Sequence, residues 1–339
     1  MNDMESSKVE QSRVTLMDEP TSSSNSGART VEEIKIPVPY GHISGKWWGP
    51  RTEQPIIAIH GWQDNAGTWD KLIPLLPNSL SVLAIDLPGH GLSSHYPKGQ
   101  FYYLFWDGVI VVRRIVKYFN WKKITIMGHS LGGAIGFLYA GIFPDEVSNL
   151  ISIDIVSPTI REVAFQTDNA AGIVDQFLKY ETLTEANMPC YSYEEMIDIV
   201  EDAYKGSITR DSCKILMKRG MALTPNNKGY HFSRDVRLKV SGLGLLSQDL
   251  VMEFASKIKC NVLNIKGVPG MSFDKPEYYY IVLNKIRENA HVEFHEVEGT
   301  HHLHLNTPER INKIIADFIQ KSYTENDESS SGSGSDIYP

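Results

Sequence analysis

The sequence predicts an α/β protein built on a doubly wound, mostly parallel sheet, and three observations carry that prediction. Short apolar runs rich in β-branched residues recur along the chain, as expected for strands buried on both faces of a parallel sheet. Helical patterns separate these runs, and Gly or Pro follows each run closely. A composition of 42% hydrophobic and 22% charged residues excludes a disordered, collagen-like or coiled-coil chain.

The elements are predicted in chain order. Residues 31–38 and 42–48 flank a turn and are expected to form an N-terminal hairpin. The buried strands are predicted at 55–60, 81–86, 123–127, 150–156, 260–265 and 291–297. The helices are predicted at 102–119, 132–143, 277–289 and 308–321. We interpret the aromatic stretches at 101–106 and 278–280 as helix packing.

One interval breaks the alternation of strands and helices. Residues 157–250 contain amphipathic helical segments and no convincing buried strand, and they are too numerous for a plain loop. We interpret 157–250 as a helical cap inserted into an α/β core that comprises 29–156 and 251–321. Residues 1–28 and the acidic Ser/Gly-rich segment 322–339 are predicted to be disordered tails, because both are poor in apolar residues.

Charge and cysteine content restrict the partners and the compartment. The net charge is −8, of which residues 1–28 contribute −3 and residues 322–339 contribute −4, so the body is near −1. A near-neutral body argues against binding to nucleic acid. Three cysteines without a CxxC pair suggest neither a disulfide framework nor a zinc site. We recognise no signal peptide and no membrane span in the sequence, and we therefore expect a soluble cytoplasmic protein. A peroxisomal or vesicular location stays open as an alternative.

The segment Ile124–Gly133 reads ITIMGHSLGG and contains the pattern G-x-S-x-G around Ser130. A predicted strand precedes it and a predicted helix follows it. In such a strand–turn–helix elbow the serine has a strained backbone, its Oγ projects above the sheet, and flanking glycines avoid collisions. We therefore interpret Ser130 as a nucleophile.

Backbone N–H groups near this serine can form an oxyanion hole. The elbow supplies the N–H of Leu131, the residue after the nucleophile. His60–Gly61–Trp62 directly follows a buried strand, and this loop places the N–H of Trp62 as a second donor.

A nucleophilic serine needs a general base, and in this chain order the base comes late. The segment 298–309, EGTHHLHLNTPE, offers His301, His302 and His304. We favour His301 because it comes first after the predicted last strand. A metal site at the three histidines is disfavoured, since no HExxH motif accompanies them. We expect neither a metal nor an organic cofactor.

With these motifs the chain resembles the α/β-hydrolase superfamily and, more narrowly, the serine hydrolase-like proteins of animals, the group that contains insect kraken. The matching residues are IHGWQDNAGTWDKLIPLL (59–76), DLPGHGLSS (86–94), GHSLGGAIGFLYA (128–140) and GTHHLHLNTPE (299–309). The resemblance implies Ser130 as the nucleophile and a cap at 157–250. It also implies His301 as the base, seven residues before Pro308. It implies a structural role for Asp86, His90 and Ser93.

The acid of the triad departs from the common family pattern. Where most members carry Asp after the penultimate strand, this chain has Pro269. Two carboxylates could substitute for it. Asp154 ends a strand before the cap, as in haloalkane dehalogenase-like relatives, and Asp274 lies in the loop where the common acid would be. We prefer Asp154 as the acid of the triad and keep Asp274 as the alternative.

The sequence therefore predicts a serine hydrolase of the carboxylesterase or thioesterase type. Ser130 would attack a small to medium acyl ester, and water would then hydrolyse the acyl-enzyme. Dehalogenase and epoxide hydrolase chemistry is disfavoured, because those relatives use Asp where this chain has Ser130. The alternative is a catalytically silent scaffold that binds a ligand or a partner. Substrate identity and oligomeric state stay open.

Overall fold

The computed structural model describes residues 29–183, 188–240, 242–272 and 275–331. Its centre is a sheet of eight strands in the order β1-β2-β4-β3-β5-β6-β9-β10. The strands are β1 (Val31–Val38), β2 (Gly41–Trp48), β3 (Ile56–Ile59), β4 (Val82–Ile85), β5 (Ile124–His129), β6 (Val147–Ile153), β9 (Asn261–Gly270) and β10 (Val292–Thr300). All pairs from β4 to β10 are parallel, whereas β1–β2 and β2–β4 are antiparallel. The predicted α/β class and mostly parallel sheet are confirmed.

Alternate side chains of the central strands pack on opposite faces, because successive residues of a strand point to opposite sides. Ile57 and Ile59 of β3 join the core that is covered by helices α1, α2, α6 and α7. Ile56 and Ala58 join a second core, which η1, η2 and α9 cover. The covering elements are α1 (Leu104–Tyr118), α2 (Leu131–Ile142), α6 (Gln248–Ala255), α7 (Pro276–Arg287), α9 (Asn312–Ser331), η1 (Ala66–Trp69) and η2 (Ile73–Leu75). Burial on both faces explains why these strands are uniformly apolar in sequence.

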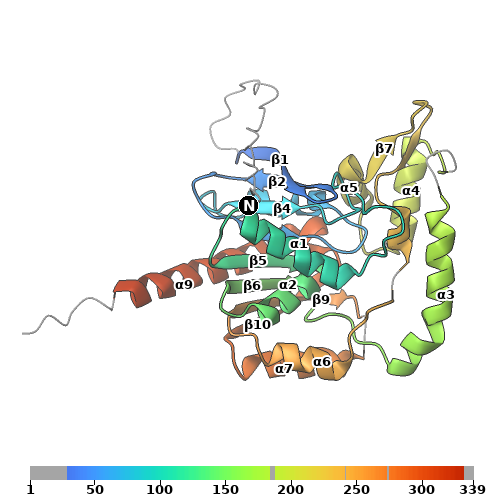
Figure 1. The fold of residues 1–339 in the computed structure, drawn as a ribbon. Helices are drawn as coiled ribbons and strands as arrows, with labels where there is room; N and C mark the ends of the chain where they lie inside the picture. Colours follow the sequence, from blue (N-terminus) through green and yellow to red (C-terminus); the bar gives the residue numbers. More distant parts are fainter. Residues whose placement is uncertain (1–28, 184–187, 241, 273–274, 332–339) are drawn as a thin grey trace, which may run out of the picture.

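The inserted segment, residues 157–250, leaves the sheet after β6 and ends within the first turn of α6. It contains α3 (Val163–Glu181), α4 (Tyr193–Ala203), α5 (Arg210–Gly220) and η4 (Val236–Lys239). It also contains a hairpin of two short strands, β7 (Met221–Leu223) and β8 (Tyr230–Phe232), which the sequence analysis missed. Figure 1 shows these elements together on one side of the sheet, opposite the end of α9.

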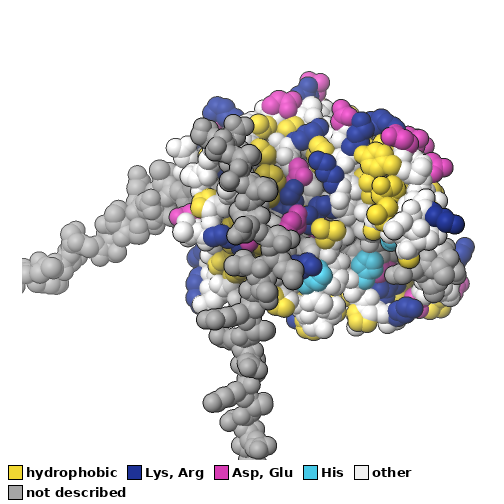
Figure 2. Space-filling model, turned by 90° about the horizontal axis from the view of Figure 1, so that it is seen from above, with side chains coloured by type: hydrophobic (Ala, Val, Ile, Leu, Met, Phe, Trp, Pro, Cys, Tyr) yellow, Lys and Arg dark blue, Asp and Glu magenta, His cyan; other side chains and the backbone are white. Residues whose placement is uncertain are grey.

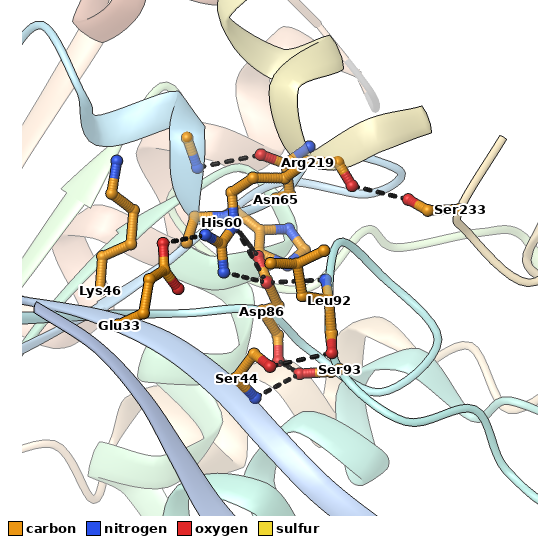
Figure 3. Close-up of polar contacts among 12 residues, drawn as sticks. Glu33, Ser44, Lys46, His60, Asn65, Asp86, Leu92, Ser93, Arg219 and Ser233 are labelled. Atoms are coloured by element: carbon orange, nitrogen blue, oxygen red, sulfur yellow. Dashed lines mark hydrogen bonds and ion pairs between the residues drawn. The ribbon is translucent and has the colours of Figure 1, made fainter. Parts of the chain in front are cut away.

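A buried ion pair ties the inserted segment to the sheet. Arg219 of α5 donates from Nη2 to Asp86 Oδ2 at 2.7 Å, and both residues are buried. Its other terminal nitrogen, Nη1, pairs with Glu33 of β1 (Figure 3). Asp86 also accepts hydrogen bonds from the backbone N–H groups of Ala66 and Leu92. These contacts give Asp86 a structural role, because they connect four parts of the chain: β1, the segment at Ala66, the segment from Asp86 to Leu92, and α5.

Helix α9 extends beyond the predicted end of the core. The predicted tail begins at 322, but the helix continues to Ser331, so the first part of that tail is helical. The other predicted tail, 1–28, lies outside the described residues. Figure 2 shows a face on which basic and acidic side chains are interspersed. Among the described residues, no helix combines the length and apolarity needed to cross a membrane.

Candidate active site

Ser130 stands at a sharp turn between β5 and α2. Its backbone has φ 49° and ψ −117°, a conformation that L residues rarely adopt. The turn requires small neighbours: a Cβ on Gly128 would lie 2.2 Å from the carbonyl carbon of Gly132, and one on Gly132 would lie 2.0 Å from Ile59 O. The predicted strand, turn and helix are therefore present around Ser130, and its side chain lies at the N-terminus of α2.

His301 follows β10 directly and reaches the same place from far along the chain. Ser130 and His301 line one cavity of about 350 Å³, together with Trp62, Tyr204 and Met271. Burial lowers the pKa of His301 below its usual value, and the hydrogen bond to Asp154 opposes that shift. The predicted nucleophile and the predicted base thus line the same cavity.

Asp154 lies just after β6 and is almost fully buried. Its Oδ2 accepts a hydrogen bond from His301 Nδ1 at 2.6 Å. The N–H groups of Gly267 and Met271 donate to its two oxygens at 2.8 and 2.9 Å, so the end of β9 and the loop after it wrap around the carboxylate. Asp274, the other predicted acid, lies outside the described residues.

Trp62 and Leu131, the two predicted oxyanion donors, share a cavity with Ser130. All three residues line a second cavity of about 320 Å³. Leu131 is the first residue of α2, so its backbone N–H donates to no carbonyl oxygen within the helix. The indole Nε1 of Trp62 donates to Leu238 O at 2.9 Å, which links this loop to the inserted segment.

The second cavity is mostly apolar. Its other lining residues come from α1 and the chain before it, from α2, from the chain just after β6, and from the inserted segment: Tyr102, Tyr103, Leu104, Phe105, Ala134, Ile155, Thr159, Arg161, Phe165, Gly242, Leu243, Gly244 and Leu245. Tyr102 and Tyr103 precede helix α1. The interpretation of the stretch 101–106 as helix packing is therefore incomplete, because part of it faces this cavity.

A buried polar group beside the first cavity was not found from the sequence. Asp64 Oδ1 accepts from Tyr204 Oη at 2.6 Å, and its Oδ2 lies 3.3 Å from His302 Nε2. Burial alone would raise the pKa of Asp64, but His302 and the hydrogen bond from Tyr204 hold the pKa below its ordinary value. This carboxylate is therefore ionised at neutral pH.

His129 completes that group. Its Nε2 donates to His301 O at 2.8 Å, and its Nδ1 lies 3.8 Å from Asp64 Oδ2. Burial and the neighbouring histidines keep the pKa of His129 well below its usual value, so the ring is neutral. In the described part of the chain, Asp64, His129 and His302 are a group whose donor atoms could hold a metal, since they lie within 4.8 Å of one another.

Comparisons with known proteins agree with the fold. Residues 54–183 match the family model described as the alpha/beta hydrolase fold. A "Probable serine hydrolase" of Drosophila melanogaster is 52% identical over 297 residues, which cover 87% of this chain and 90% of that protein. A "Serine hydrolase-like protein" of Danio rerio is 35% identical over 307 residues and covers 90% of this chain and 93% of its own length.

Among solved structures, a hypothetical protein of Pseudomonas aeruginosa PAO1 superposes with a TM-score of 0.75 at 28% identity. The match covers 86% of this chain and 99% of that one. The fold is thus the α/β-hydrolase fold that the sequence motifs predict. The chain belongs to the serine hydrolase-like family of α/β-hydrolases.

Proposed function

We propose that the protein is a serine esterase or thioesterase that cleaves small to medium acyl esters through an acyl-enzyme on Ser130. One observation carries the proposal: His301 donates from Nδ1 to the buried Asp154 carboxylate while sharing a cavity with Ser130. The carboxylate fixes the proton on Nδ1, so Nε2 carries the lone pair that takes the serine proton. That arrangement is required of a general base next to a nucleophile.

The reaction then proceeds in two halves. Ser130 Oγ attacks the carbonyl carbon, His301 Nε2 takes the serine proton, and the N–H groups of Trp62 and Leu131 donate to the oxyanion. The alcohol or thiol leaves with the proton from His301. A water molecule then gives a proton to His301 and attacks the acyl carbon. His301 returns that proton to Ser130 Oγ as the bond to the acyl group breaks, which releases a carboxylic acid and restores Ser130.

The two cavities suggest how a substrate would lie. The apolar cavity, with Phe105, Phe165 and Leu245 on its wall, fits the acyl chain, because burying apolar surface is favourable. The other cavity, whose lining includes the polar side chains of Gln63 and Lys205, fits the leaving group. The inserted segment contributes to both walls, so we assign it the role of a cap that selects the substrate.

A chain-length series tests the proposal. Purified protein is assayed with p-nitrophenyl esters from acetate to laurate, with Ser130→Ala as the matched control. We expect hydrolysis that depends on Ser130 and a kcat/KM that peaks at intermediate length and falls once the acyl chain exceeds the apolar cavity. A folded wild-type protein that hydrolyses no ester or thioester of the series would favour the silent-scaffold alternative.

The location of the protein is a separate proposal. The three cysteines are not paired with one another: Cys213 and Cys260 are buried, and Cys190 is exposed. Free thiols are typical of a reducing compartment. We therefore assign the protein to the cytoplasm, which fluorescence microscopy of the tagged full-length chain would test.

A further inference from the structure

We propose that Asp64, His129 and His302 form a binding site for a zinc-like transition metal ion beside the catalytic residues. Their donor atoms come from three separate parts of the chain: the loop after β3, the end of β5 and the segment after β10. All three residues are buried, and all three line the cavity that Ser130 and His301 share. A solvated ion entering that cavity would therefore reach them.

The first argument is the orientation of His129. A carbonyl oxygen can only accept, so the contact with His301 O places the proton of the neutral ring on Nε2. Nδ1 then presents a lone pair toward Asp64 Oδ2 at 3.8 Å. Among the described residues, none donates a hydrogen bond to this buried nitrogen. Two acceptors that face one another inside a protein call for a cation or a proton donor between them.

The second argument is the room beside these atoms. Gly61 borders the group, and a Cβ at that position would lie 2.9 Å from His129 Nδ1 and 3.3 Å from Asp64 Oδ2. A side chain there would occupy the space next to both donor atoms. The glycine keeps that space open.

The third argument is the distances between the donor atoms of Asp64, His129 and His302. In a tetrahedral zinc site with bond lengths of about 2.0–2.2 Å, neighbouring donor atoms lie about 3.4 Å apart. The carboxylate oxygen lies 3.3 Å from His302 Nε2 and 3.8 Å from His129 Nδ1. Two imidazoles and one carboxylate suit Zn²⁺, Co²⁺ or Ni²⁺ better than Mg²⁺ or Ca²⁺, which prefer oxygen.

His302 can adopt the tautomer that metal binding requires. Its Nδ1 lies 2.8 Å from the hydroxyl of Ser207, which can either donate or accept. When Ser207 accepts, the proton sits on Nδ1 and Nε2 is free to bind a metal. The hydroxyl also orients the ring, as partners of metal-binding histidines commonly do.

An ion at this site would obstruct the reaction proposed above. It would lie in the cavity that we assign to the leaving group. Two of its ligands, His129 and His302, are the sequence neighbours of Ser130 and His301. Zn²⁺ should therefore act as an inhibitor of ester hydrolysis, reversible by EDTA. This consequence rests on the proposed function, whereas metal binding itself does not.

Calorimetric titration of the full-length protein with Zn²⁺ alone tests the site without any assay of activity. We expect one ion per chain for wild type. Asp64→Asn should weaken binding by more than about 100-fold, since even changing a residue that only orients a metal ligand costs about 10- to 100-fold. The matched control is His291→Gln/His295→Gln, which removes two exposed histidines that flank Glu293 and could bind Zn²⁺ at the surface. The control should bind as wild type does.

Two further measurements keep the proposal falsifiable if Asp64→Asn misfolds, which circular dichroism would reveal. His302→Gln should lose the ion as well, and Co²⁺ bound to wild type should give the intense visible bands of tetrahedral coordination. The proposal is overturned if wild type binds no Zn²⁺, if folded Asp64→Asn or His302→Gln binds as tightly as wild type, if the surface variant abolishes binding, or if the Co²⁺ bands are absent. Binding without inhibition would contradict only the inhibitory consequence.

Discussion

His301 Nδ1 lies 2.6 Å from Asp154 Oδ2, although the two residues are 147 positions apart in the chain. The contact is buried: the side chain of Asp154 is 1% exposed and that of His301 is 6% exposed. A charge-assisted hydrogen bond in such surroundings is strong and fixes the orientation of the imidazole.

Replacing the carboxylate tests its role directly. Asp154→Asn should lower kcat by about four orders of magnitude, as removal of the acid does in serine proteases, because the amide no longer fixes the required tautomer. The measurement is steady-state ester hydrolysis with circular dichroism as a check on folding. Asp274→Asn, made in parallel, should keep wild-type kcat. The reverse pattern would identify Asp274 as the acid.

The pH dependence follows from the state of His301. The base must be neutral to accept a proton, and burial lowers its pKa in the folded protein. The neutral form therefore persists to lower pH than in free histidine, and kcat/KM should fall on the acid side with a midpoint below about pH 6.5. A pH profile of kcat/KM measures this midpoint. A midpoint above that value, or no acid limb at all, would contradict the assignment.

The ion pair between α5 and the sheet is expected to stabilise the fold. Arg219→Met leaves Asp86 buried without its cation, which should lower the free energy of unfolding by about 3 kcal/mol or more. Arg210, at the start of the same helix, pairs at the protein surface with Glu194, Asp198 and Glu201. Arg210→Met should therefore cost much less than Arg219→Met, because solvent screens exposed ion pairs. Urea unfolding of both variants makes the comparison, and equal losses would argue against a structural role for Asp86.

Local patterns predicted the sheet and the elbow. Ser130 could be recognised from a short stretch of sequence, because the glycines that permit its turn lie two residues before and two residues after it. The buried strands were recognisable because burial on both faces demands unbroken apolar runs. Strands β7 and β8 were missed because three residues carry too little periodicity to be detected.

Features that depend on long-range contacts were predicted less well. The choice between Asp154 and Asp274 stayed open because it depends on how the chain after β9 folds back around the carboxylate. Asp64 carried no local signal, since Tyr204 is 140 positions away and His302 lies near the other end of the chain. Whether Tyr102 and Tyr103 pack on a helix or line a cavity depends on where the inserted segment comes to rest.

Covalent labelling tests most directly whether Ser130 is an activated nucleophile. The folded wild-type protein is treated with a fluorophosphonate, and the modified residue is located by mass spectrometry of peptides. We predict a single adduct on Ser130, none on the Ser130→Ala variant, and much slower labelling of Asp154→Asn. A wild-type protein that remains unmodified at Ser130, or is modified at another serine instead, would contradict the account.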